Sequence, residues 1–205
     1  MRLNFLTHVR GSPFAFPMAA LAALAMFLIS ESSYQQASST FEELGKQSVA
    51  RTNIQTLWRS LIDAETGQRG YLLTGRREYL KPYEDGKAEA ARSLGWLEQY
   101  YGADPYTAGL VKRVGNASKA KLSELSETMD LHDHGGGWQD LMLSNIGQEQ
   151  METVRSVSKT LLQFETERVD IARAKVSQTL MLNRIGVTAM TALSLLALFM
   201  YLRKA

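Results

Sequence analysis

The sequence contains no cysteine, and this absence removes several classes of protein at once. Without a thiol there is no disulfide framework, no cysteine nucleophile, no thiolate zinc site and no iron–sulfur cluster. Proline is scarce as well, with 4 residues among 205, and the β-branched alternation that is typical of strands is nearly absent. The chain is long enough for one domain or two, with a sizeable core. These absences favour a core built from helices.

Acidic residues are missing from both ends of the chain. All 21 of them lie between Glu31 and Asp170, and residues 13–30 and 185–202 carry no charge of either sign. At about 1.5 Å of rise per residue, each run is near the lower limit of length for crossing ~30 Å of hydrocarbon. We therefore expect two transmembrane helices, with the lipid bilayer as a partner.

The basic residues at the ends predict an orientation. Arg2 and Arg10 precede the first run, while Arg203 and Lys204 follow the second, so the positive-inside rule places both termini in the cytoplasm. A cleaved signal peptide is an alternative for the first run, because a basic segment precedes it. The predicted order is cytoplasmic residues 1–12, a span at 13–30, a periplasmic or extracellular domain at 31–184, a span at 185–202 and cytoplasmic residues 203–205.

Apolar residues spaced by three and four form four helical stripes between the spans. The stripes are Ile54, Leu57, Leu61, Ala64, Gln68 and Tyr71; Leu80, Tyr83, Lys87, Ala90, Leu94, Leu97 and Tyr101; Val111, Val114, Ser118, Leu122, Leu125 and Met129; and Val154, Val157, Leu161, Phe164, Arg168 and Ile171. Each stripe needs a partner to bury it, so the four helices are expected to pack together.

Glycines and an N-cap signal mark the ends of these helices. Gly75 follows the first stripe, and Asp104 before Pro105 is the pattern of an N-cap with proline at the first helical position. We expect helices at about 31–74, 78–101, 105–132 and 138–184. The predicted fold class is all-α: a membrane-anchored antiparallel four-helix bundle whose long first and last helices are continuous with two transmembrane helices.

No pattern of catalytic residues is found. His132, Asp133 and His134 offer donors for a metal ion, but their spacing is not a helical i, i+4 pair, and a polar loop explains them equally well. Acid–base pairs three or four positions apart, such as Glu165 and Arg168, are typical of solvated helix faces. The exported part is slightly acidic and has no basic stripe. We expect no enzyme, no cofactor, no metal site and no nucleic-acid partner.

One stretch differs from generic helical sequence. Residues 61–75 read LIDAETGQRGYLLTG and residues 78–83 read EYLKPY. The stretch resembles the signature of the type-three CHASE domain, which runs D-x-E-T-G-x-R-G-Y-L-L-T-G and then Y-L-x-P-Y, with all of those positions occupied. Gly147 and Met151 resemble a weaker pattern near the start of the family's last helix. The resemblance covers about residues 40–180.

The resemblance implies a function in bacterial signal transduction. The family is an extracellular sensory module of histidine kinases, nucleotide cyclases, diguanylate cyclases and chemoreceptors. It implies an inner-membrane sensor, expected as a homodimer, in which an external stimulus moves the long helices and so reaches a cytoplasmic kinase, cyclase or chemotaxis-type output partner. The alternative is a non-sensing structural or accessory subunit of a membrane complex that uses the bundle for protein interaction.

The same stretch predicts a tight turn at the tip of the bundle. Its glycines allow close helix approach, and its tyrosines can pack inward. The turn either only shapes the fold or lines a site for a small ligand or partner; a third possibility is that its glycines mark a bend that relays movement. The candidate residues are Glu65, Arg69, Gly70, Tyr71, Thr74, Gly75, Tyr79, Pro82 and Tyr83.

Overall fold

The computed structural model describes residues 15–202, with the side chains of residues 24–196 and of Phe199. The predictions for residues 1–14 and 203–205 lie outside the described residues. The signal-peptide alternative for the first run also depends on that part of the chain.

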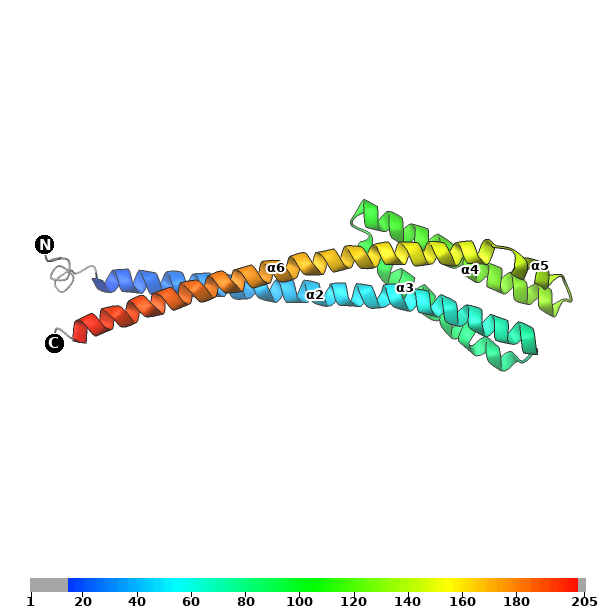
Figure 1. The fold of residues 1–205 in the computed structure, drawn as a ribbon, viewed down its shortest axis with the longest axis horizontal. Helices are drawn as coiled ribbons and strands as arrows, with labels where there is room; N and C mark the ends of the chain where they lie inside the picture. The colour runs from blue at the N-terminus through cyan, green and yellow to red at the C-terminus, as the bar shows by residue number, and fades with distance from the viewer. Residues whose placement is uncertain (1–14, 203–205) are drawn as a thin grey trace. The chain divides into compact units, whose positions relative to one another are not determined.

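Every regular element in the described residues is helical (Figure 1), so the predicted all-α class is confirmed. The elements are α2 (Ala15–Thr74), the 3₁₀ turn η1 (Arg77–Tyr79), α3 (Leu80–Tyr101), α4 (Pro105–Asp133), α5 (Trp138–Leu143) and α6 (Ile146–Leu202). As predicted, the first and last helices continue into the apolar runs without interruption.

The last helix begins later than predicted, because a break separates α5 from α6. Ser144 leaves helical geometry with a ψ of 145°, and its backbone and hydroxyl both donate to the carbonyl of Leu141. The expectation of one helix starting at residue 138 was therefore wrong. The N-cap prediction is confirmed: the Asp104 carboxylate accepts from the Thr107 amide at 2.8 Å, and these hydrogen bonds lower the pKa of Asp104.

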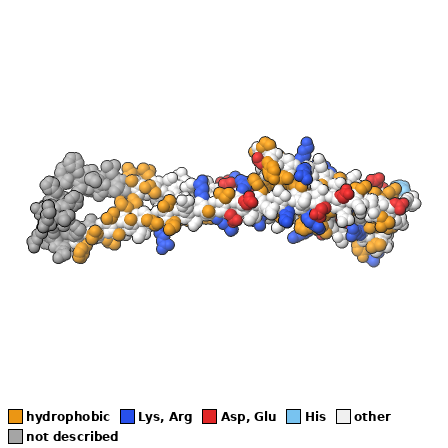
Figure 2. All heavy atoms as spheres, turned by 45° about the horizontal axis from the view of Figure 1, so that its top comes forward, with side chains coloured by type: hydrophobic (Ala, Val, Ile, Leu, Met, Phe, Trp, Pro, Cys, Tyr) orange, Lys and Arg blue, Asp and Glu red, His pale blue; other side chains and the backbone are white. Residues whose placement is uncertain are grey.

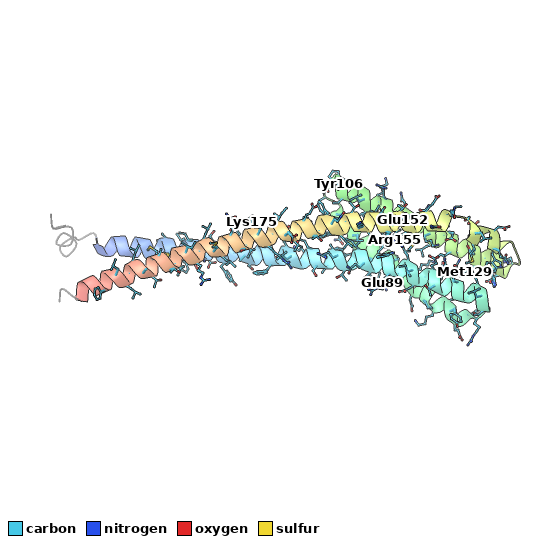
Figure 3. The ribbon with its side chains drawn as sticks, viewed as in Figure 1. Glu89, Tyr106, Met129, Glu152, Arg155 and Lys175 are labelled. Atoms are coloured by element: carbon cyan, nitrogen blue, oxygen red, sulfur yellow. The ribbon has the colours of Figure 1, made fainter. Side chains whose placement is uncertain are left out.

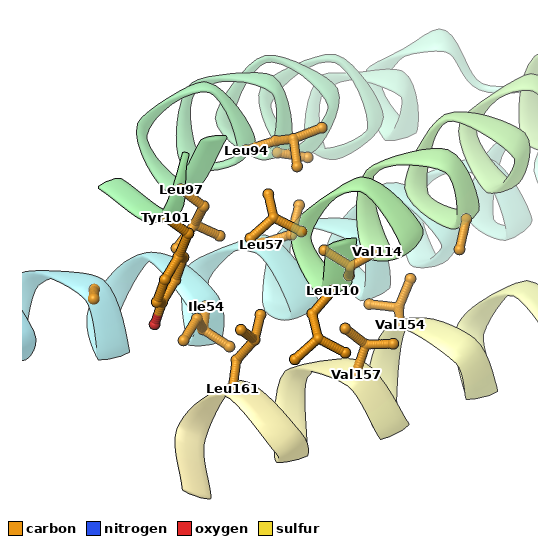
Figure 4. Packing of buried hydrophobic residues seen from close by; sticks show 14 of the residues in the cluster. Ile54, Leu57, Leu94, Leu97, Tyr101, Leu110, Val114, Val154, Val157 and Leu161 are labelled. Carbon is orange, nitrogen blue, oxygen red and sulfur yellow. The ribbon is translucent and has the colours of Figure 1, made fainter. Parts of the chain in front are cut away.

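The chain divides into two compact units. Unit 1 comprises the described parts of residues 1–44 and 170–205, and unit 2 comprises residues 45–169. Within unit 2 the chain reverses direction between α2 and α3, between α3 and α4, and again before α6 (Figure 1). One core cluster draws buried residues from all four of these helices (Figure 4). Its largest members are Ile54, Leu57, Leu61, Leu94, Leu97, Tyr101, Leu110, Val111, Val114, Val154, Val157 and Leu161.

The predicted stripes agree with this core to different degrees. All six residues of the first stripe are at most 6% exposed. The last stripe was predicted wrongly at its end: Ile171 is 70% exposed and lies in unit 1, Phe164 is only partly buried, and the buried face instead continues from Leu161 to Glu165. A step of four residues, rather than three, keeps that face directed at the core.

Unit 1 has a surface of large apolar side chains. On α2 these include Leu24, Phe27 and Ile29, which are 54–64% exposed, and Figure 2 shows hydrophobic side chains gathered over this part of the molecule. On the part of α6 that belongs to unit 1, the exposed large apolar residues are Ile171, Leu180, Met181, Leu182, Ile185, Val187, Leu193, Leu195, Leu196 and Phe199. Among the described residues, one helix, within Trp138–Leu196, is long and apolar enough by composition to cross a membrane.

Candidate functional site

The motif turn, defined here as residues 61–83, ends α2 and begins α3. Gly75 adopts a left-handed backbone with φ of +67°, which ends the helix, and its amide donates to the Tyr71 carbonyl at 2.8 Å. The Thr74 hydroxyl donates to the Gly70 carbonyl at 2.7 Å and accepts from the Arg76 amide at 3.2 Å. The two threonine bonds and the glycine together satisfy backbone groups that the end of a helix leaves open.

Two glycines of the motif let α3 start directly against the backbone of α2. A Cβ atom on Gly67 would lie 2.8 Å from both the Tyr79 carbonyl oxygen and the Tyr83 amide nitrogen. A Cβ atom on Gly70 would lie 2.6 Å from Cδ1 of the Tyr79 ring, and Pro82 is also within reach of Gly67. The two halves of the motif therefore contact each other, and the glycines are needed for space rather than for flexibility.

The three tyrosines of the motif have different surroundings. Tyr83 is 3% exposed and packs with Ala64 and Leu125, with the Lys87 ammonium 5.9 Å from its ring centre. Tyr79 covers Gly70 but is itself 39% exposed. Tyr71 is directed toward the end of α4 instead. The tyrosines therefore do not converge on one site.

Tyr71 connects the end of α2 to the end of α4. Its hydroxyl donates to the Asp133 carboxylate at 2.6 Å, and the His132 ring contacts the same carboxylate at 3.1 Å. The His132 ring also lies edge-on to the rings of Tyr71 and Trp138. Hydrogen bonds from Tyr71 and His132 lower the pKa of Asp133, and the hydrogen bond to Asp133 raises the pKa of Tyr71.

The histidines at the end of α4 are part of this local network. Nδ1 of His134 contacts the carbonyl of Asp130 at 2.7 Å, so this ring does not share a metal-binding position with His132. Within the described residues, no group of three or more histidine, aspartate or glutamate side chains is arranged to hold a metal ion. His132 and Asp133 lie in the last turn of α4 rather than in a loop, and His134 is the residue that caps this helix.

Glu65 lies in a charge cluster that the sequence reasoning did not find. One of its oxygens pairs with Arg69 at 2.5 Å, and the other lies 3.5 Å from the ammonium of Lys121. Lys121 is 4% exposed and also pairs with Glu124 at 2.8 Å. The first turn of α6 packs on this cluster, because a Cβ atom on Gly147 would lie 2.7 Å from the ammonium nitrogen.

A second buried charge lies near the other end of unit 2. Glu165 was expected on a solvated face, but its side chain is fully buried, and it accepts a hydrogen bond from the Tyr101 hydroxyl at 2.8 Å. The Arg168 guanidinium is 3.5 Å away. Burial and the hydrogen bond to Glu165 raise the pKa of Tyr101. The spacing of the sequence could have predicted that both charges are buried, because Lys121 and Glu165 each lie three or four residues from other buried positions on the same helix.

Comparison with known protein families identifies the family of this chain. The CHASE3 domain model matches residues 42–175, which include the whole motif turn and both buried charge clusters. The chain belongs to the CHASE3 domain family. The resemblance predicted from the motif is thereby confirmed. A CHASE3 domain is an extracellular sensory domain rather than a catalytic one, so this chain is a membrane protein that carries a sensory input module.

Other comparisons add little to the family assignment. No curated protein matches the chain. Among solved structures, it is similar to the sensor domain of the histidine kinase HK9 from Rhodopseudomonas palustris, with 20% sequence identity over 71% of this chain and 96% of that chain. The TM-score of that match is 0.39, which is too low to establish a shared fold.

Proposed function

We propose that this CHASE3 chain is a two-pass sensor of the bacterial inner membrane, with both termini in the cytoplasm and residues 31–184 on the far side. Unit 2 acts as an antiparallel four-helix bundle that receives the stimulus. The signal reaches a cytoplasmic output of the kinase, cyclase or chemotaxis type by movement of the long helices. The motif turn contributes by holding the tip closed through Gly67, Gly70 and Tyr79, where α2 and α3 are in contact.

The continuity of α6 is the observation that carries the proposal. This helix runs for 57 residues from Ile146 to Leu202, a length of ~85 Å at 1.5 Å per residue. Its first half supplies Val154, Val157 and Leu161 to the core of unit 2, and its last part carries the exposed apolar side chains of unit 1. A displacement at one end of an unbroken helix is transmitted to the other, because its backbone hydrogen bonds keep its length and phase.

A helix-phase experiment tests this relay. A histidine-kinase output domain is fused after Ala205, and one to seven alanines are inserted after Ser177, an exposed position of α6. Each inserted residue rotates everything beyond it by about 100° at 3.6 residues per turn. We expect kinase activity in membranes to vary with that period, and an insertion of seven residues to restore most of the activity because it is close to two full turns.

The matched control places the same insertions in the glycine loop at Gly136, between α4 and α5. A loop does not transmit helix phase, so these insertions should leave activity at the level of the unmodified fusion. Activity that ignores the insertions in α6, or that responds equally to those in the loop, contradicts the relay. A stoichiometric complex with a non-signalling membrane protein, together with that result, would support the accessory-subunit alternative.

A further inference from the structure

Five buried polar atoms in unit 2 have no hydrogen-bond partner among the described residues. Two lie on α2, two on α6 and one on α3: Gln47 Oε1, Trp58 Nε1, Ser158 Oγ, Glu165 Oε2 and Ser93 Oγ. Such atoms are rare in folded proteins, because leaving a buried polar group unpaired is unfavourable. By contrast, the buried polar side chains of α4 all make hydrogen bonds, namely Thr107, Ser118, Lys121 and Thr128. The unpaired atoms are therefore concentrated on α2 and α6.

The unpaired atoms of α2 and α6 lie along one interface, where the two helices run antiparallel within unit 2. The Arg51 guanidinium of α2 lies 3.4 Å from the Thr166 hydroxyl of α6. Farther along, the guanidinium of Arg155 on α6 (Figure 3) lies 5.8 Å from the ring centre of Trp58 on α2. These two contacts fix which residues of the two helices are at the same level.

Trp58 and Ser158 form the first of two complementary pairs across the interface. Ser158 follows Arg155 by three residues, so the two side chains are neighbours on one side of α6. Because Arg155 contacts the Trp58 ring, Ser158 lies at the same level as that ring. An indole Nε1–H can only donate and a serine hydroxyl can accept, yet neither atom has a partner in the described part of the chain.

Gln47 and Glu165 form the second pair. Glu165 is next to Thr166, and Gln47 is one turn of α2 before Arg51, so both belong to the part of the interface that the Arg51–Thr166 bond connects. The Gln47 amide nitrogen can donate to a carboxylate oxygen, and Oε2 of Glu165 has no donor. Its other oxygen, Oε1, accepts from the Tyr101 hydroxyl of α3 at 2.8 Å. Glu165 can therefore bond α2 while it keeps its bond to α3.

We propose that the α2–α6 interface of unit 2 is a two-state switch, and that the arrangement described above is the state in which both polar pairs are open. In the second state α6 rotates slightly against α2. Trp58 then donates to Ser158, and Gln47 donates to Glu165. The movement is small, since Glu165 must stay bonded to Tyr101. The switch is a property of the bundle itself, whereas its use in signalling rests on the proposed sensory function.

Distances between two spin labels test the switch on the full chain in mild detergent. The chain has no cysteine of its own, so labels on Gln55→Cys and Glu149→Cys, exposed positions of α2 and α6, report how these helices are arranged. We expect two populations of distances. Ser158→Ala removes the acceptor for Trp58 and should shift their ratio about tenfold toward the arrangement described above, since the second state loses a hydrogen bond.

Two matched controls remove a buried hydroxyl elsewhere. Ser93→Ala removes the unpaired hydroxyl of α3, and Ser118→Ala removes one that donates to the Val114 carbonyl at 2.8 Å. Both should leave the ratio unchanged. Trp58→Phe removes the donor of the same pair, and it should shift the ratio in the same direction as Ser158→Ala. This second variant keeps the test decisive if Ser158→Ala alters folding.

Three results would overturn the switch: a single population of distances in the labelled chain, an equal shift in Ser93→Ala, or opposite shifts in Ser158→Ala and Trp58→Phe. The relay can fail separately. If Ser158→Ala changes the ratio of the two populations but leaves the output of the kinase fusion unchanged, the relay is contradicted and the switch stands.

Discussion

The contact between α3 and α2 at Gly86 predicts a large effect of a single methyl group. In Gly86→Ala the new Cβ atom would be 2.4 Å from the Ser60 carbonyl oxygen, whereas ordinary van der Waals contact begins at 3.4 Å. The helices must separate by about 1 Å, which loosens the core contacts of Leu57 on α2 and Leu94 on α3. Overpacking of this kind costs about 1–3 kcal/mol, and because the obstacle is backbone we expect the upper part of that range.

Gly95→Ala is the matched control on the same helix. Nothing lies within 4 Å of its Cβ position, so only the helix preference for alanine remains, and the variant should gain about 0.5–1 kcal/mol. Urea unfolding of the full chain in mild detergent, followed by the fluorescence of Trp58 and Trp96 beside the core, measures both free energies of unfolding. Equal stabilisation by the two substitutions would refute the close approach.

Two further predictions concern the end of α4 and the assembly. Because Asp133 has a lowered pKa, its contribution to stability is present above its ordinary pKa of about 4 and is lost as pH falls through the lowered value. Tyr71→Phe should therefore be less stable than wild type at neutral pH, and the two unfolding midpoints should converge in acid; a pH-independent difference would contradict this. We also expect a homodimer that covers the exposed Ile171: a cysteine at that position should crosslink two chains in membranes, whereas Arg173→Cys, about 200° around α6, should not. Equal crosslinking at both positions would count against this dimer face.

Much of the fold follows from periodicity alone. The first stripe is buried at all six positions, because its residues are apolar or amide-bearing and repeat at three and four without a competing pattern. Two helix boundaries were also predicted from local residues. The glycine after Thr74 can adopt the left-handed backbone that ends a helix, and Asp104 before Pro105 is the pattern of an N-cap with proline at the first helical position. The break at Ser144 has no comparable signal, since serine is common both inside and outside helices.

The sequence predicted the candidate site only in part. The contact of Gly67 and Gly70 with Tyr79 follows from the motif, but the close approach of α3 to α2 at Gly86 does not, because Gly86 lies outside the motif. Lys121 was passed over because its charge assigns it to the surface, although it is four residues before the buried Leu125. A spacing of three and four residues predicts correctly which face of a helix is buried. Residue polarity gives the wrong prediction wherever a buried charge has partners on another helix.

The buried charges constrain how the helices of unit 2 can move. The hydrogen bond between Tyr101 on α3 and Glu165 on α6 lies inside the core, so a slide of α6 by a full turn would leave a buried carboxylate without its donor. By contrast, the bond between Arg51 on α2 and Thr166 on α6 is exposed and 3.4 Å long, so water can replace it at little cost. A movement of α6 must therefore either keep Glu165 within hydrogen-bonding reach of Tyr101 or carry α3 with it. Of these two hydrogen bonds, the one to α2 costs less to break, so movement of α6 relative to α2 is less costly than movement relative to α3.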